Sequence, residues 1–486
     1  MKAPRSKWLI LAIIAIAQFM VVLDTSIVNV ALPSIQKALS FKSATSLQWI
    51  ITSYTLTFGG FLLLGGRAAD LYGRKRMFLI GVAGFTISSL VVALSSSSSV
   101  LIVLRGVQGL SAAFMSPAAL SILLTTFRDG EDRNRALSVW AAVAAGGAAA
   151  GVLLGGILTQ YLGWRWDFLV NIPVGIIVSI VAYRILPTHE SEATNTNLDL
   201  PGAFLVTSGL MLLVYGLVKA PSYGWSSSST VYMIGGAIAL LVAFVVNELR
   251  VKQPLVDLSI FRQGNVAAAN VVQMTITATL FSMFFFLSLY IQQTLGYSPV
   301  RSGLAFLPIT FIIGMTATYV GSIIGRVGFK PFMVVAPLIM ASALYLFGSV
   351  PVNGSYVHDV LPGLIIMAIG LGMSFVSLTI AATGGVAPDK SGLASGLINT
   401  SQQVGGALGL AILSGVSTSA ITKYFTDAHQ AITPALQAKA TVSGFHAAFH
   451  AGMVFAIVAS VIALIFVRSS RGPKAATSDA PVVMAH

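Results

Sequence analysis

Two side chains of opposite charge lie deep inside apolar stretches of this sequence. Asp24 follows an apolar run that starts at Trp8, and Arg105 is enclosed by a second run. In a helix, Asp24 would lie about 24 Å along the axis from Trp8. A charge at such a depth in a bilayer costs roughly 2.5–3.5 kcal/mol and normally faces a cavity or a partner. The two residues could neutralise each other as a structural pair. Alternatively, Asp24 binds a proton or another cation, and Arg105 controls how readily it does so.

The composition requires a lipid environment for these two charges. Of the 486 residues, 56% are hydrophobic and only 9% are charged, whereas soluble domains carry about 25% charged residues. A soluble protein could not bury so much apolar surface in one core. The chain has no cysteine, which excludes disulfides and thiolate metal sites. The sequence therefore predicts an all-α polytopic protein of the cell membrane, with the lipid bilayer as its main partner.

Apolar stretches of about 20 residues, long enough to cross a bilayer, indicate fourteen transmembrane helices. The predicted spans are 8–32, 47–66, 77–96, 98–124, 136–160, 168–187, 201–219, 230–249, 265–292, 302–325, 331–350, 358–384, 392–421 and 445–467. With this count, roughly three quarters of the 28 lysines and arginines fall on the face that holds the N-terminus. The asymmetry predicts that both termini are cytoplasmic. It also explains the net charge of +13 without any nucleic-acid partner.

A weak internal repeat divides the chain. The pattern around Gly66, Asp70 and Gly73 after the second span recurs in weaker form around Gly321 and Gly325 after the tenth. Duplicated halves of this kind are a transporter architecture, with the binding site at the midplane between them. We expect a first six-helix bundle in 1–190, two inserted linker helices in 191–262, a second six-helix bundle in 263–470, and a disordered cytoplasmic tail in 471–486.

The loop after the second span carries a specific motif. It reads Gly66-x-x-x-Asp70-x-x-Gly73-Arg74-Lys75, in which glycines permit a tight turn and the charges anchor the cytoplasmic side. The spacing resembles the loop motif of the major facilitator superfamily. The resemblance implies the major facilitator fold, with this loop acting as a cytoplasmic latch between helices.

Further motifs resemble those of one branch of that superfamily, the fourteen-span drug:proton antiporters of the EmrB/QacA type. They are Leu23-Asp24-Thr25-Ser26-Ile27-Val28-Asn29 in the first span, Leu104-Arg105-Gly106-Val107-Gln108-Gly109 in the fourth, and Trp164-Arg165-Trp166-x-Phe168-x-x-Asn171 before the sixth. The resemblance implies that Asp24 and Arg105 serve proton coupling, with protons as the coupling ion and no other cofactor.

The fifth span has small residues at four-residue spacing, Gly147, Gly151 and Gly155, followed by Gly156. Such spacing lets helices pack closely. The run also resembles the superfamily's antiporter motif, although Val152 occupies the position of the motif's proline. The motif therefore supports antiport only in part.

Candidate substrate-cavity residues combine polar groups with adaptable apolar side chains in several spans. The set is Asp24, Asn29, Gln108, Asn270, Gln273, Met274, Phe281, Phe285, Tyr290 and Gln402. The face that these residues share in the ninth span cannot be chosen from the sequence. His446 and His450 lie four residues apart, but with no third ligand apparent we expect no metal site.

The sequence therefore favours a protein that exports small lipophilic or cationic compounds, drugs or antibiotics, in exchange for protons, and functions as a monomer. A proton-coupled importer or a lipid exporter on the same fold are the alternatives, since fold alone does not fix direction. A membrane enzyme or receptor is less favoured, because Asp24 stands nearly alone among the spans and no Gly-Lys dipeptide offers a P-loop.

Overall fold

The computed structural model describes residues 7–41, 43–127, 131–187, 198–386, 390–429 and 433–469, and these are helical with no strand among them. The predicted tail, 471–486, and the predicted boundary at 190/191 lie outside these ranges. Thirteen of the described helices are long and apolar enough to cross a membrane. The predicted fifth span corresponds to a further helix of 31 residues, α6.

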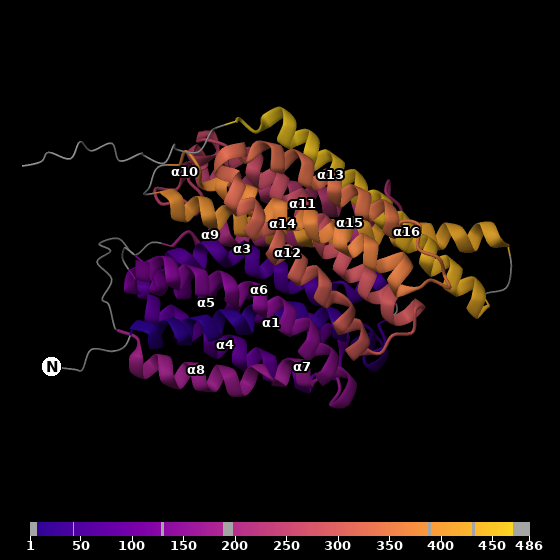
Figure 1. Ribbon diagram of the computed structural model, residues 1–486, viewed down its shortest axis with the longest axis horizontal. Coiled ribbons are helices and arrows are strands. Elements are labelled where there is room, and N and C mark those ends of the chain that lie inside the picture. Colours follow the sequence, from indigo (N-terminus) through magenta and orange to yellow (C-terminus); the bar gives the residue numbers. More distant parts are fainter. Residues whose placement is uncertain are drawn as a thin grey trace, which may run out of the picture.

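Helices from the first half of the chain form one bundle, which is indigo to magenta in Figure 1. Its long helices are α1 (Lys7–Ala38), α3 (Trp49–Tyr72), α4 (Arg74–Leu94), α5 (Ser98–Thr126), α6 (Glu131–Tyr161) and α8 (Asn171–Ile185), with the short α2 (Ala44–Leu47) and α7 (Trp166–Leu169) between them.

Helices from the second half form the other bundle, orange to yellow in Figure 1. They are α11 (Val266–Leu289), α12 (Pro299–Val327), α13 (Lys330–Phe347), α14 (Leu361–Thr383), α15 (Ser391–Ala428) and α16 (Pro434–Phe466). Two π-helical turns, Tyr290–Thr294 and Tyr356–Val360, adjoin α11 and α14. α12 begins at Pro299 because the Ser298 side chain accepts a hydrogen bond from Arg301 N, and proline is favoured in the first turn of a helix.

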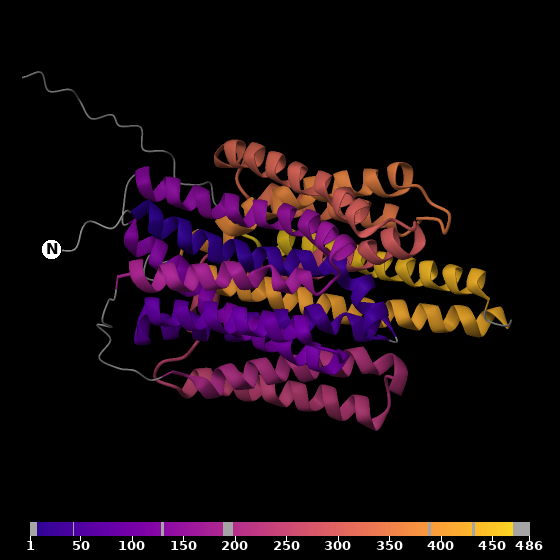
Figure 2. The same cartoon turned by 90° about the horizontal axis from the view of Figure 1, so that it is seen from below.

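The inserted pair α9 (Leu200–Tyr223) and α10 (Ser228–Arg250) is an antiparallel hairpin that lies along one side of the molecule in Figure 2. It packs through α9 against α3 and α15, one helix from each bundle. A 3₁₀ turn at Leu258–Arg262 then leads into α11. The hairpin is therefore positioned to contact both bundles.

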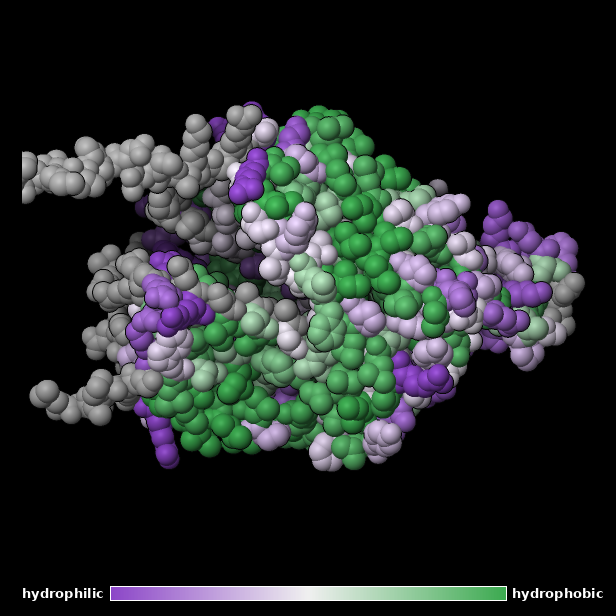
Figure 3. Space-filling model, viewed as in Figure 1, coloured by the Kyte–Doolittle hydropathy of each residue, from purple (hydrophilic) through white to green (hydrophobic). Residues whose placement is uncertain are grey.

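The surface agrees with a lipid environment. Large apolar side chains are highly exposed on the outer helices, for example Leu94 at 69%, Phe204 at 70% and Tyr232 at 78%. In Figure 3 the apolar residues form a broad band across the molecule, and polar residues gather toward the two ends. A soluble monomer rarely exposes so large an apolar surface, so this band marks the membrane-facing region.

The bundles touch at the end where α1 finishes and α12 begins. Ser288 Oγ donates to Asn29 O at 2.7 Å, and Gln292 Nε2 donates to Val30 O at 3.0 Å. Gln293 Nε2 also donates to the Gln36 side chain at 2.8 Å. These contacts join α1 to the end of α11 and close this end of the interface.

Glycines extend the same closure between α6 and α12. A Cβ at Gly156 would lie 2.6 Å from Pro299 O, and one at Gly303 would lie 2.6 Å from Val152 O. Within the described residues, a Cβ at Gly314 or Gly321, further along α12, would meet nothing within 4 Å. The two helices are therefore in direct contact only where small residues permit it.

The α6–α12 contact predicts the effect of one substitution. Gly303→Val should force the two helices apart and reduce transport by roughly tenfold or more, because its methyl groups would overlap the α6 backbone. Gly321→Val, the same change on the same helix at an open position, should keep most of the transport. Dye efflux from cells at matched expression measures both, and equal loss in the two variants would contradict this role of Gly303.

Candidate functional site

Asp24 and Arg105 meet inside the first bundle. Both are buried, with 0% and 1% of their side chains exposed, and Arg105 Nη1 lies 2.5 Å from Asp24 Oδ2. Arg105 is held in place by Nε, which donates to Ile50 O at 3.1 Å, and by Tyr54, whose ring centroid lies 4.4 Å from the guanidinium carbon. The two deep charges that the sequence singles out therefore form one ion pair.

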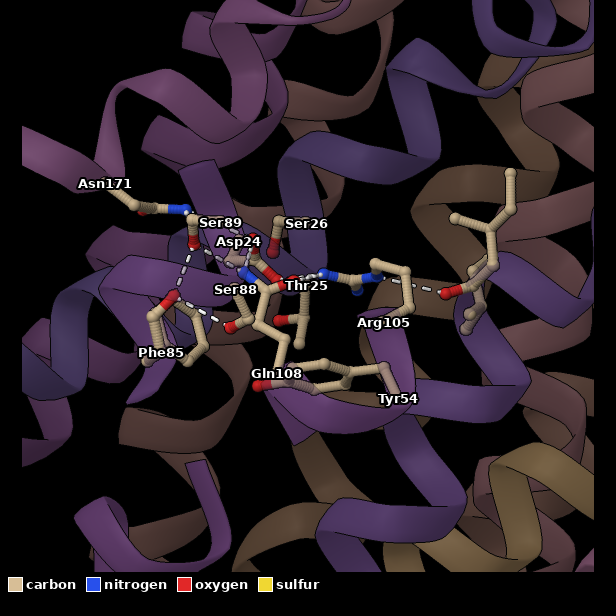
Figure 4. A network of polar contacts seen from close by, with 12 residues as sticks. Asp24, Thr25, Ser26, Tyr54, Phe85, Ser88, Ser89, Arg105, Gln108 and Asn171 are labelled. Carbon is tan, nitrogen blue, oxygen red and sulfur yellow. Dashed lines mark hydrogen bonds and ion pairs between the residues drawn. The ribbon is translucent and has the colours of Figure 1, made fainter. Parts of the chain in front are cut away.

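Amide and hydroxyl groups complete the surroundings of the carboxylate (Figure 4). Gln108 Nε2 donates to Asp24 Oδ1 at 2.9 Å and to Ser89 Oγ at 2.8 Å, while Gln108 Oε1 accepts from Arg105 Nη1 at 2.6 Å. Asn171 Nδ2 also donates to Asp24 Oδ1, at 3.2 Å. Both carboxylate oxygens are thus hydrogen-bonded, which is the condition under which a buried charge is tolerated.

Four helices supply this network, which we call the Asp24 network: Asp24 from α1, Ser89 from α4, Arg105 and Gln108 from α5, and Asn171 from α8. Arg105 and Gln108 are three residues apart and so share a helix face. Gln108 was predicted as a cavity residue, but it is fully buried and serves the ion pair. Ser89 and Asn171 were not predicted, although Asn171 belongs to the motif before the sixth span.

A second buried acid lies near this network. Asp167 is 0% exposed, and its Oδ2 accepts from Thr159 Oγ1 at 2.5 Å. It precedes Asn171 by one helical turn, because α7 and α8 are joined by Val170 in helical conformation. The sequence interpretation left this position of the motif unassigned, and a buried carboxyl group here could only be recognised once the helix face was known.

The antiporter-motif glycines lie against α1 beside Asp24. A Cβ at Gly147 would lie 3.1 Å from Val22, one at Gly151 2.8 Å from Leu23 O, and one at Gly155 3.0 Å from Ile27 O. Three successive turns of α6 thus pack on α1 near the carboxylate, and Gly151 and Gly155 lie directly on the α1 backbone. Gly156 instead faces α12, as described above, and α6 continues without a break through Val152.

The loop motif ties helix ends together within the first bundle. Gly73 has a φ of +94°, which only glycine adopts readily, and lets α4 start directly after α3. Lys75 Nζ donates to Tyr183 O at 2.7 Å and Leu186 O at 2.8 Å, at the C-terminal end of α8. Arg74 lies 3.5 Å from Asp70 in an exposed ion pair. Gly66 makes a looser contact with Pro117 on α5.

The candidate cavity residues of α11 lie on one side of the helix, and Tyr290 follows in the π-helical turn after it. Met274 and Phe281 pack on Gly405 and Gly406 of α15, while Phe285 and Tyr290 are fully buried within the second bundle. Tyr290 donates its hydroxyl to Pro351 O at 2.7 Å.

The polar candidates have different hydrogen-bond partners. Asn270 bonds to Ser401 Oγ at 2.7 Å on α15, and Gln273 is 4% exposed. Asn29 donates to Thr25 O within α1, and Gln402 is half-buried on α15. Asn270, Met274 and Phe281 thus contact α15, and the other members of the set make separate contacts. A groove along α12, lined by Thr310, Phe311, Gly314, Met315, Thr318 and Tyr319, is open and was not predicted.

Two helical bundles that pack together through α6 and α12 and through α3 and α15, with a buried charge network in the first, define the fold of a secondary membrane transporter. The chain belongs to the Major Facilitator Superfamily, whose family profile matches residues 14–410. It is a multi-pass membrane protein of that family.

Several relatives cover most of the chain. The sequence is 37% identical to a puromycin resistance protein of Streptomyces alboniger over 99% of this chain and 95% of that protein. It is 39% identical to the cephamycin export protein CmcT of Amycolatopsis lactamdurans over 83% of each chain.

Solved structures share the fold at low sequence identity. A bacterial homolog of the human lysosomal transporter Spinster, in an inward-facing and occupied conformation, superposes with a TM-score of 0.70 at 15% identity, covering 97% of this chain and 98% of that one. The POT family transporter PepTSo gives 0.69 at 16% identity over 96% and 98%.

Two adjacent serines of α4 test the Asp24 network. Ser89→Ala removes the acceptor that orients Gln108 and should lower proton-coupled transport several-fold, since a hydrogen bond between neutral groups contributes roughly 0.5–1.5 kcal/mol. Ser88, which bonds only to the backbone of its own helix, supplies the control, Ser88→Ala, which should transport normally. The measurement is the initial rate of dye uptake into everted vesicles. Similar rates in the two variants would mean that Ser89 does not support the site.

Proposed function

We propose that this chain exports small lipophilic or cationic compounds, drugs or antibiotics among them, in exchange for protons, with Asp24 as the proton-binding group. The observation that carries the proposal is the fully buried Asp24–Arg105 ion pair. Its carboxylate also accepts hydrogen bonds from Gln108 and Asn171. The named activities of the relatives, puromycin resistance and cephamycin export, support outward transport of small molecules.

Protonation of Asp24 would change the forces that hold α1. The ionised carboxylate attracts Arg105 strongly because little water screens the pair. A neutral Asp24 would lose most of that attraction and leave the guanidinium to Gln108, Ile50 O and the Tyr54 ring. The balance of contacts between α1, α5 and α8 therefore depends on whether a proton is bound.

The same helix carries the closure between the bundles. Asn29 O and Val30 O, which accept from Ser288 and Gln292 on the other bundle, lie between one and two turns beyond Asp24. A shift or rotation of α1 after protonation would disturb these bonds, and α6 would follow because its glycines pack on α1. Proton binding is thereby linked to opening of the closed end, as alternating access requires.

Removing the carboxylate tests proton coupling directly. Asp24→Asn keeps the shape of the side chain and one acceptor oxygen but cannot be ionised or carry the transported proton, so proton-driven transport should fall at least tenfold. Asp427→Asn, at the exposed end of α15, is the matched control and should behave as the wild type. Substrate-induced proton release from everted vesicles, with the expression level checked, is the measurement. Full proton-coupled efflux by Asp24→Asn would overturn the assignment.

A growth-inhibition panel tests the substrate class. In an efflux-deficient host, the wild-type chain should raise the inhibitory concentration of at least one antibiotic or lipophilic cation several-fold, and Asp24→Asn should remove that protection. Puromycin and a cephamycin belong in the panel because relatives are named for them. If Asp24→Asn still protects the cells, export does not depend on this carboxylate. If the chain instead increases uptake of the compounds, it is an importer.

A further inference from the structure

The linker hairpin contains a second pair of buried acids, remote in sequence from the Asp24 network. Asp199 caps the start of α9, and Glu248 lies in the last turn of α10. Both are almost completely buried, with 5% and 4% of their surface exposed. Buried carboxyl groups require a compensating charge, a set of donors or a proton.

Three of the four carboxyl oxygens have a donor. Asp199 Oδ1 accepts from Gly202 N at 2.8 Å, and Asp199 Oδ2 accepts from Asn247 Nδ2 at 2.7 Å. Glu248 Oε2 accepts from Val256 N at 2.8 Å. Glu248 Oε1 is buried and receives no hydrogen bond from the described part of the chain.

The fourth oxygen faces the other acid. A Cβ at Gly202 would lie 2.4 Å from Asp199 Oδ2 and 2.7 Å from Glu248 Oε1, so both oxygens lie over the same glycine. The two carboxyl groups therefore lie side by side. No lysine or arginine among the described residues forms an ion pair with either group. Two carboxylates in contact cannot both be ionised without a cation between them.

We propose that Asp199 and Glu248 form a proton-binding site in which Glu248 Oε1 carries the proton and donates it to Asp199 Oδ2. Asp199 is the ionised partner, because two donors and the N-terminal end of α9 stabilise its charge. Glu248 is the neutral partner, because its Oε1 has no donor among the described residues and is free to carry the proton. The ligand of this site is one proton, and none of its residues belongs to the Asp24 network.

The bound proton holds the loop that follows α10. That loop is fixed at Val256 by Glu248, and it reaches both bundles: Gln253 Oε1 accepts from Arg67 Nη2 of α3 at 3.0 Å, and Asp257 pairs with Lys390 at the start of α15, 2.5 Å away. We call residues 251–257 the linker strap. Loss of the proton would place two negative charges in contact, drive Glu248 toward solvent and release Val256.

The titrating group of the strap is then the acid pair and not the ion pair at its end. The hydrogen bond from Lys390 lowers the pKa of Asp257 to about 2, so this carboxylate stays ionised at neutral pH. Of the charged groups that face the strap from α3, α9 and α15, the pair Asp199–Glu248 is the one whose charge changes in this range.

Thiol labelling can follow the strap directly, because the natural chain contains no cysteine. A single cysteine at Val256→Cys would replace a side chain that is 7% exposed, and one at Lys252→Cys would occupy an exposed position of the same strap. The rate of maleimide labelling at position 256 divided by that at position 252 corrects for the pH dependence of the thiol itself. Membranes are labelled from about pH 5 to pH 9, because a carboxyl group that is protonated more readily than usual loses its proton within this range.

We expect this ratio to be low in acid and to rise several-fold as the pH increases. In the Glu248→Gln background it should stay low throughout, because the glutamine amide donates to Asp199 and its oxygen still accepts from Val256 N. In Asp199→Asn the transition should move down by about one pH unit or more, because the repelling charge is gone.

Three results would overturn the proposal. They are a flat ratio in the otherwise unmodified chain, a transition that survives in Glu248→Gln, and a transition that is unmoved in Asp199→Asn. The Asp24→Asn background should keep the transition in full. The readout does not depend on transport, so failure of the proposed export function would leave this result interpretable.

Discussion

The structure depends on one buried ion pair. Placing Asp24 and Arg105 inside the first bundle removes both charges from water and from lipid headgroups, and their attraction offsets that penalty only if every remaining polar atom is satisfied. Gln108 meets this need by donating to Asp24 and accepting from Arg105 at once. Four helices must therefore keep a fixed arrangement around the pair. A change in its charge alters their relative positions more than a change in any apolar contact would.

α1 carries that change to the interface between the bundles. It is packed against α6 through three glycines, and at Gly151 and Gly155 the two backbones are in direct contact. It also provides the carbonyls of Asn29 and Val30 to the second bundle. Backbone carbonyls cannot move without the helix. The charge network and the closed end are thus mechanically connected through a single element, which favours an all-or-none response.

The sequence predicts the charges well and their neighbours poorly. Asp24 and Arg105 stand out because charged residues in apolar spans are rare. Their opposite charges alone suggest that they form an ion pair. Ser89 and Asn171 do not, since serine and asparagine occur widely in membrane helices and only their orientation makes them relevant. The same limit explains α11, where Met274 and Phe281 face α15 while Tyr290 faces Pro351. When a helix has no distinct polar face, its sequence does not indicate which side faces which neighbour. The positions of the membrane spans depend only on length and hydropathy, so this part of the fold could be predicted.

The two acid sites compensate a buried carboxyl group in different ways. Asp24 is deep in the bundle, where water cannot reach it easily, and a permanent cation compensates it. Glu248 lies at the end of its helix, within one turn of the exposed Lys252, and its neighbour is another acid. A permanent cation keeps a carboxylate ionised until the structure opens, whereas an adjacent acid makes the carboxyl group responsive to the pH of the compartment it faces. A site of the first kind suits energy coupling, because its protonation is tied to conformation. A site of the second kind suits sensing, because its protonation follows the surroundings and moves only the strap that it holds.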